Sequence, residues 1–365
     1  MTTTTKKRAS TKPRRTTPPV NASVIDLFCG AGGLSYGFKQ EGFQIAAGFD
    51  IDEACRFPFE ANNDAPFVCE DISRAAAAAI AKRFTPKAPR ILVGCAPCQP
   101  FSTYNQKNSD PKWRLVNRFS DLIEEIGPDV VSMENVPALL RFGDGKIFKR
   151  FVDRLCADGY DVWWDVAFAP AYGVPQVRKR LVLLASRLGP IELEAPTHTE
   201  DDYPTVRDAI GALPPLRAGA TDKRDPLHRS SGMSDLNLAR VRNSRPGGTW
   251  RDWSPKIVAA CHRKDTGRGY SSVYGRMGWD EPSPTITTQF FGFGNGRFGH
   301  PTQNRALSLR EGAILQSFPR NYKFVPPGED PMFKSLGRMI GNAVPVGLAR
   351  AIARSVKSHL DDYAG

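Results

Sequence analysis

Short apolar runs alternate with helical segments through the first half of the chain. The apolar runs have the length of buried strands and lie at 23–28, 44–49, 67–69, 90–94 and 129–133. Helical segments separate them, including 113–126 and 73–84, for which Ser73 is the expected N-cap. This alternation predicts an α/β fold with a parallel, doubly wound sheet covered by helices on both faces.

Chemically distinctive residues follow four of these strands, at 29–33, 50–52, 95–99 and 134–136. In a doubly wound sheet the carboxyl ends of the strands meet along one edge, where ligands bind. The sequence therefore predicts a single site at that edge. Residues 188–300 differ in texture, being rich in glycine, proline, arginine and aromatic residues without a long periodic helix, so we expect a smaller, loop-rich domain there.

The charge balance favours a polyanionic partner. Six of the residues behind the formal charge of +12 lie in residues 1–20, which contain no acid and cannot bury enough apolar surface to order themselves. Either a solubilising leader or an arm that adds affinity for nucleic acid fits this composition. An apolar run of about 18 residues, which a membrane-spanning helix needs, does not occur, so a soluble, intracellular protein is expected.

A glycine-rich turn follows the first strand, in the stretch DLFCGAGGLSYGF (26–38). Gly30, Gly32 and Gly33 permit tight turning and close approach of a ligand to the backbone. Ser35 occupies the position where a dinucleotide fingerprint has glycine or alanine, and Asp50 follows at the distance of a ribose-binding acid. The combination indicates an adenosyl ligand without a pyrophosphate. Asp71 is either an adenine contact or a solvated turn acid.

The stretch GCAPCQPFS (94–102) places Cys95 and Cys98 in a C-x-x-C spacing. A redox pair, half of a metal site, and one nucleophile with a bystander all fit the spacing alone. In a reducing compartment the seven scattered cysteines are not expected to form disulfides, and no histidine has the spacing of a metal ligand, so no metal is expected.

Eight blocks together resemble the DNA (cytosine-5)-methyltransferases of bacterial restriction–modification systems. In the family's order they are DLFCGAGG, FDID, EDI, GCAPCQPFS, ENV, PQVRKR, RALSLREGAILQSFP (305–319) and GNAVPVGLARAIA (341–353). The resemblance implies a Rossmann-like, S-adenosylmethionine-dependent methyltransferase sheet with a second, smaller domain. It divides the chain into a disordered basic tail (1–22), a catalytic and cofactor-binding domain (23–187, completed by 338–365), and a target-recognition domain and hinge (188–337).

The resemblance implies a role for each catalytic residue. Cys98 would add to C6 of a flipped cytosine so that C5 can accept a methyl group, and Cys95 would be a bystander. Glu134 would bond the N3/N4 edge and donate a proton at N3. The other catalytic residues would be Arg178 near the base O2, Arg180 in support, and Pro97, whose carbonyl would face the exocyclic amine. Gln99, Ser102 and Gln176 would contact DNA.

The cofactor implied is S-adenosylmethionine, released as S-adenosylhomocysteine. Its expected contacts are Phe28 at the adenine face, Gly30, Gly32 and Leu34 at the methionine end, Asp50 at the ribose, Ile51, Asp71 and Ile72 at the adenine, and Asn342 and Val344 closing the pocket.

Double-stranded DNA is the expected partner of a cytoplasmic, nucleoid-associated monomer, with a cognate restriction endonuclease acting independently. A dithiol oxidoreductase would leave Glu134 and the arginines unexplained, and an inactive DNA-binding module would have lost Cys98 or Glu134. A tRNA cytosine methyltransferase of the same fold would lack the long insert.

Overall fold

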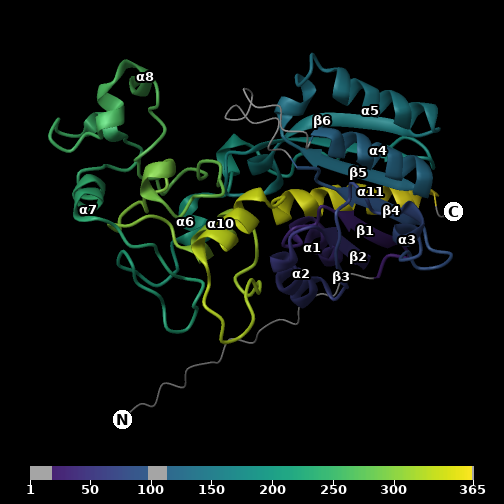
Figure 1. Cartoon of the computed structure of the whole chain (residues 1–365), viewed down its shortest axis with the longest axis horizontal. Coiled ribbons are helices and arrows are strands. Elements are labelled where there is room, and N and C mark those ends of the chain that lie inside the picture. Colours follow the sequence, from purple (N-terminus) through teal and green to yellow (C-terminus); the bar gives the residue numbers. More distant parts are fainter. Residues whose placement is uncertain (1–18, 98–112, 364–365) are drawn as a thin grey trace, which may run out of the picture.

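The computed structural model describes residues 19–97 and 113–363. Its centre is a seven-stranded sheet with helices on both faces (Figure 1). The strands are β1 (Ser23–Leu27), β2 (Gln44–Asp50), β3 (Phe67–Cys69), β4 (Arg90–Gly94), β5 (Val130–Asn135), β6 (Asp161–Phe168) and β7 (Lys179–Ser186), in the order β3-β2-β1-β4-β5-β7-β6. The α-helices are α1 (Gly33–Gln40), α2 (Arg56–Asn63), α3 (Ala77–Ala81), α4 (Arg114–Ile126), α5 (Lys146–Ala157), α6 (Val206–Ile210), α7 (Asp235–Arg242), α8 (Asp265–Arg268), α9 (Leu309–Leu315), α10 (Phe333–Asn342) and α11 (Val346–Tyr363).

The sheet is mixed rather than wholly parallel. Strands β1 to β5 pair in parallel, as predicted, but β7 runs antiparallel to both β5 and β6. Strands β6 and β7 are joined by a short connection, and an antiparallel pair needs no crossover helix. The doubly wound α/β fold is confirmed, with this one reversal.

Alternate residues of the central strands pack into two separate hydrophobic cores, one on each face of the sheet. Val24 packs with the helices α1 and α11, whereas Ile25 and Leu27 pack with α3, α4 and α5 on the other face. Successive side chains of a strand point to opposite faces, so a strand buried on both sides must be apolar at nearly every position. That requirement produces the mostly apolar runs in the sequence, in which Asp26 of β1 is an exception.

Two expected element boundaries are corrected. The helix predicted over 73–84 begins only at Ala77, because the N–H of Ser73 donates to Asp71 Oδ1 at 2.9 Å and closes a turn instead of capping a helix. The fifth strand extends to Asn135, so Glu134 and Asn135 lie within the strand and not beyond it.

The loop-rich segment forms a second lobe, with α6, α7 and α8 away from the sheet and α10 reaching between the two lobes (Figure 1). An aromatic cluster that includes Trp250, Trp253 and Phe293 fills part of it. The boundary expected at 337/338 falls within α10. Ala22, assigned to the tail, is buried in the main core. The basic residues of the tail lie outside the described residues.

No helix within 19–97 and 113–363 is long and apolar enough to cross a membrane.

Candidate active site

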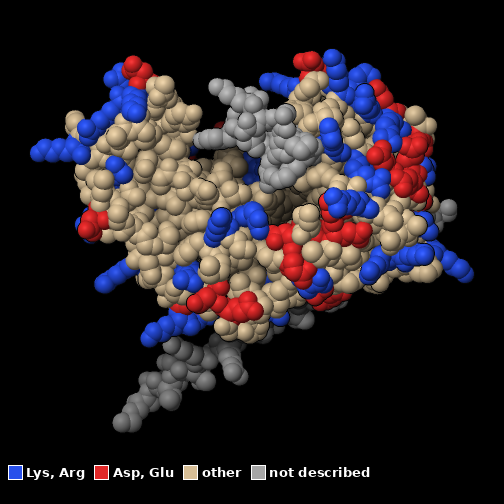
Figure 2. Space-filling view, viewed as in Figure 1, with Lys and Arg blue, Asp and Glu red and all other residues tan. Residues whose placement is uncertain are grey.

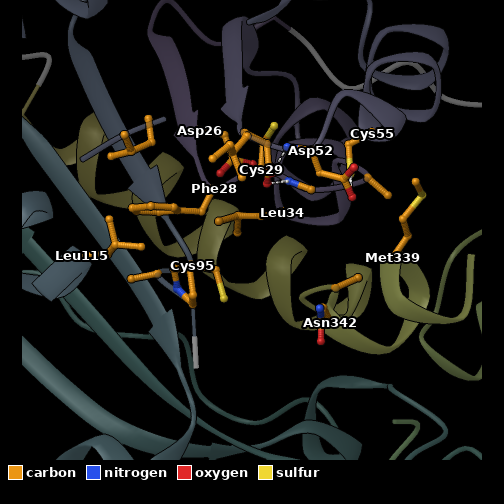
Figure 3. A pocket seen from close by; sticks show the side chains of 18 of the residues that line it. Asp26, Phe28, Cys29, Leu34, Asp52, Cys55, Cys95, Leu115, Met339 and Asn342 are labelled. Atoms are coloured by element: carbon orange, nitrogen blue, oxygen red, sulfur yellow. Dashed lines mark hydrogen bonds between the residues drawn. The ribbon is translucent and has the colours of Figure 1, made fainter. Parts of the chain in front are cut away.

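A cavity of about 570 Å³ lies at the carboxyl ends of β1, β2 and β4 (Figure 3). Nine of the ten residues expected to bind the cofactor line it: Phe28, Gly30, Leu34, Asp50, Ile51, Asp71, Ile72, Asn342 and Val344. Gly32 does not. A Cβ on Gly32, which has φ +85°, would meet Asn63 Nδ2 at 2.2 Å, so this glycine is required for packing against α2. The volume suits a small-molecule ligand.

Asp50 is held by two backbone donors at the edge of the cavity. The N–H of Gly30 donates to its Oδ2 and the N–H of Asp52 to its Oδ1, both at 2.9 Å. Burial raises the pKa of Asp50, and these hydrogen bonds partly oppose that effect. Both oxygens keep a lone pair, so the carboxylate can accept bonds from vicinal hydroxyls.

Asp71 also lines the cavity, where Ser73 fixes its carboxylate. Hydrogen bonds from the Ser73 side chain and N–H hold the pKa of Asp71 below its usual value. It therefore stays ionised as an acceptor facing the cavity.

Asp26 is a buried pocket residue that sequence reasoning missed (Figure 3). Ser35 Oγ donates to its Oδ2 at 2.6 Å, while its Oδ1 has no hydrogen-bond partner within the described part of the chain. Burial raises the pKa of Asp26 from 3.8 to about 7. The sequence contains an indication of this residue, because an acid within the buried strand SVIDLF is unusual: aspartate is almost never fully buried unless it has a partner.

A second acidic site lies beside the cavity at the end of β5. Glu134 is 2% exposed, with the Nε of Arg180 at 2.9 Å from its Oε1 and the Sγ–H of Cys95 donating to its Oε2 at 2.9 Å. Cys95 and Pro97 also line the cofactor cavity. The carboxylate and the cavity are therefore neighbours along one edge of the sheet.

The two arginines of the PQVRKR block have different surroundings. Arg180 contacts Glu134, whereas the guanidinium of Arg178 is buried and donates to the carbonyls of Ile286, Gly341 and Ala343. Of the two arginines, Arg180 is therefore the one beside the Glu134 carboxylate, whereas Arg178 bonds the backbone of two segments distant in the sequence.

Gln176 is fully buried, which is at odds with the expected DNA contact. Its Nε2 donates to the Leu315 carbonyl and to Gln316 Oε1, and its Oε1 accepts from the N–H of Ile286. Both ends of the amide are thus used inside the protein, where they join the segment before β7 to the segments around 286 and 315. Nothing local in the sequence indicates this role, because the partners lie more than 100 residues away.

Three expected site residues, Cys98, Gln99 and Ser102, lie outside the described residues. The backbone that precedes them is described as far as Pro97. Asn135 Nδ2 donates to the carbonyl of Ala96 at 3.0 Å, so the strand that carries Glu134 also fixes the backbone two residues before Cys98.

No group of three or more His, Cys, Asp or Glu side chains that could hold a metal ion occurs in residues 19–97 and 113–363.

A Rossmann-like sheet with this pocket at its strand ends defines a methyltransferase fold of the S-adenosylmethionine-dependent class. A crystal structure of a DNA modification methyltransferase encoded within a prophage (E. coli) superposes with a TM-score of 0.72 at 22% identity, covering 93% of this chain and 99% of that one. The sequence profile described as C-5 cytosine-specific DNA methylase matches residues 22–358, and the chain belongs to this family.

Named relatives support the same assignment. The type II methylase M.HgiDII of Herpetosiphon aurantiacus is 49% identical over 340 residues, covering 93% of this chain and 96% of that protein. The type II methyltransferase M.Eco47II of Escherichia coli is 31% identical over 351 residues, covering 93% and 79%. The chain is a DNA (cytosine-5)-methyltransferase.

Proposed function

We propose that this enzyme methylates C5 of a cytosine flipped out of a specific double-stranded DNA sequence, through a covalent bond between Cys98 and C6. The observation that carries the proposal is the position of Glu134. It is a buried carboxylate beside the cofactor pocket, on a strand that also fixes the start of the Cys98 loop.

The residues around the pocket fit S-adenosylmethionine. Gly30 has open space where a Cβ would point, and a Cβ on Gly33 would lie 2.7 Å from the Val344 carbonyl, so the cradle between α1 and the C-terminal segment requires glycine. Asp50 supplies acceptors for the ribose hydroxyls, Asp71 for the adenine amine, and Phe28 an aromatic surface. When bound, the cofactor supplies an electrophilic methyl group.

The protein's own groups address the weak nucleophilicity of C5. The Cys98 thiolate adds to C6 while the Glu134 carboxyl group donates its proton to N3, which makes C5 an enamine carbon. C5 takes the methyl group and then loses its proton to a base as the C6–S bond breaks, which releases the thiolate, and N3 returns its proton to Glu134 so that the aromatic ring is restored. Arg180, which contacts Glu134, would face the base O2 in place of Arg178, and the Pro97 carbonyl would accept a hydrogen bond from the exocyclic amine.

Target recognition is assigned to the second lobe. Figure 2 shows a hollow between the lobes with Lys and Arg side chains along its edges. The arginines of the second lobe separate into buried ones that bond carbonyls, such as Arg276, and exposed ones that we assign to phosphates and base edges: Arg242, Arg245, Arg251, Arg263 and Arg268. Because the relatives named above are type II enzymes, a cognate restriction endonuclease acting independently is also proposed.

A mechanism-based trap tests the proposal. A duplex carrying 5-fluorocytosine at the target position cannot lose fluorine as a cation, so a denaturation-resistant adduct should accumulate only when S-adenosylmethionine is present. Peptide mapping should place the link on Cys98, and Cys98→Ser should abolish it because a hydroxyl is scarcely ionised at neutral pH. An adduct on another residue, or none with the wild-type enzyme, contradicts the proposal.

A further inference from the structure

Cys95 occupies the boundary between the cofactor pocket and the base-binding carboxylate. It follows the last residue of β4, and Gly94 pairs in register with Met133, so Cys95 lies beside Glu134 on the neighbouring parallel strand. Its side chain lines the cavity, as Figure 3 shows, and its Sγ–H donates to Glu134 Oε2 at 2.9 Å.

The Glu134 carboxylate is thereby held at both oxygens. Arg180 Nε lies 2.9 Å from Oε1, and the Cys95 thiol occupies Oε2. Arg180 forms an ion pair at Oε1, which accepts no hydrogen bond from the described residues, so Arg180 alone would leave the carboxyl group free to rotate about its Cγ–Cδ bond, a terminal torsion whose energy well is broad. The hydrogen bond from the Cys95 thiol to Oε2 removes that freedom.

We propose that Cys95 is a positioning residue that orients Glu134 toward the N3/N4 edge of the flipped cytosine. This inference rests on the role proposed above for Glu134. It replaces the interpretation of Cys95 as a bystander, and it assigns the C-x-x-C spacing to two separate tasks: Cys98 bonds the base and Cys95 orients its partner. The thiol keeps its proton in this role and undergoes no redox change.

The reaction should therefore need a donor at position 95 and not a sulfur atom. Cys95→Ala removes the donor and should lower kcat about 10- to 100-fold, the range set by hydrogen bonds to charged groups. KM for S-adenosylmethionine and for DNA should change less than about threefold, because the bond matters after both are bound. Cys95→Ser keeps a donor at a slightly shorter reach and should restore kcat to within about threefold of wild type.

A double-mutant cycle separates positioning from simple packing. In the Glu134→Gln background, Cys95→Ala should lower kcat by less than a further factor of about three, because the carboxyl group that Cys95 orients is no longer present. Equal losses from Cys95→Ala in both backgrounds would assign Cys95 to packing and overturn the inference. Cys95→Val, which fills a similar volume without a donor, should behave like Cys95→Ala and serves if the alanine variant does not fold, as judged by thermal melting.

Cys156→Ala, at an exposed cysteine on α5, is the control for a generic thiol loss and should retain wild-type kcat. A wild-type rate for Cys95→Ala, or failure of Cys95→Ser to recover activity in a folded protein, sinks the inference. If Glu134→Gln itself keeps wild-type turnover, the proposed function fails instead, so the two failures are distinguishable.

Discussion

The Tyr322 hydroxyl donates a hydrogen bond to the carbonyl of Ala31, which joins the segment after α9 to the glycine-rich loop. Tyr322 is fully buried, and its ring packs on Phe318 and Tyr36. The segment directly after the block RALSLREGAILQSFP therefore packs against the glycine-rich loop that lines the pocket.

Tyr322→Phe should weaken cofactor binding. It keeps the ring but leaves the Ala31 carbonyl without its donor, which costs about 1–3 kcal/mol of folding free energy for a buried acceptor. Because Ala31 lines the pocket, KM for S-adenosylmethionine should rise several-fold while KM for DNA changes little. Steady-state kinetics and thermal melting measure both effects.

Tyr160→Phe is the matched control, because the Tyr160 hydroxyl donates to the Pro128 carbonyl at 2.6 Å, away from the pocket. It should lose comparable stability with no change in KM for the cofactor. If the two substitutions changed KM for S-adenosylmethionine equally, the predicted effect of Tyr322 on cofactor binding would be wrong.

The pH dependence of stability should reveal Asp26. Its pKa is 3.8 in the unfolded chain and about 7 in the fold, where burial disfavours the charged form. The protonated Asp26 side chain therefore makes its full contribution to the free energy of unfolding below about pH 4. That contribution is lost as pH rises through about 7, which lowers the free energy of unfolding by about 4 kcal/mol. Asp26→Asn stays neutral, so between pH 5 and 8 its unfolding free energy should fall less steeply than that of the wild type. Parallel curves from denaturant titrations of the ligand-free proteins would exclude this role.

Exchange of residues 188–300 for the matching region of a relative should move the methylated sequence. Chemistry is assigned to the sheet edge and recognition to the second lobe, so the two should separate. Bisulfite sequencing of host DNA reports the target directly. A folded, active chimera that keeps the original target would refute the assignment.

The sequence predicts the sheet edge better than it predicts side-chain partners. Apolar runs identify β1, β2, β4 and β5 because strands covered on both faces must be apolar throughout. Strand β6 cannot be recognised in this way. It lies at the edge of the sheet and exposes Asp161, Trp164 and Asp165, so polar residues interrupt its apolar sequence. The direction of β7 carries no local signal at all.

The site shows the same division. Position along a strand brings Glu134, Asp50 and the glycine loop to one edge, and local periodicity suffices to see this. The different neighbours of Arg178 and Arg180 depend on carbonyls contributed by residues more than 100 positions away, which spacing within PQVRKR cannot indicate.

The reversed assignment of the two arginines leads to opposite phenotypes. Arg178→Lys replaces a planar fork that bonds several buried carbonyls with a single ammonium, so it should lower the unfolding free energy by about 2–3 kcal/mol, with a smaller effect on kcat of the folded enzyme. Arg180→Lys should melt near the wild-type temperature but lose kcat at least about tenfold, because a point charge fixes the orientation of Glu134 less well than a guanidinium. Thermal melting and single-turnover methylation of both variants, measured side by side, decide the matter. If Arg178→Lys is the stable but inactive variant, Arg178 faces the base, as the family resemblance first implied, and the roles drawn from the geometry are wrong.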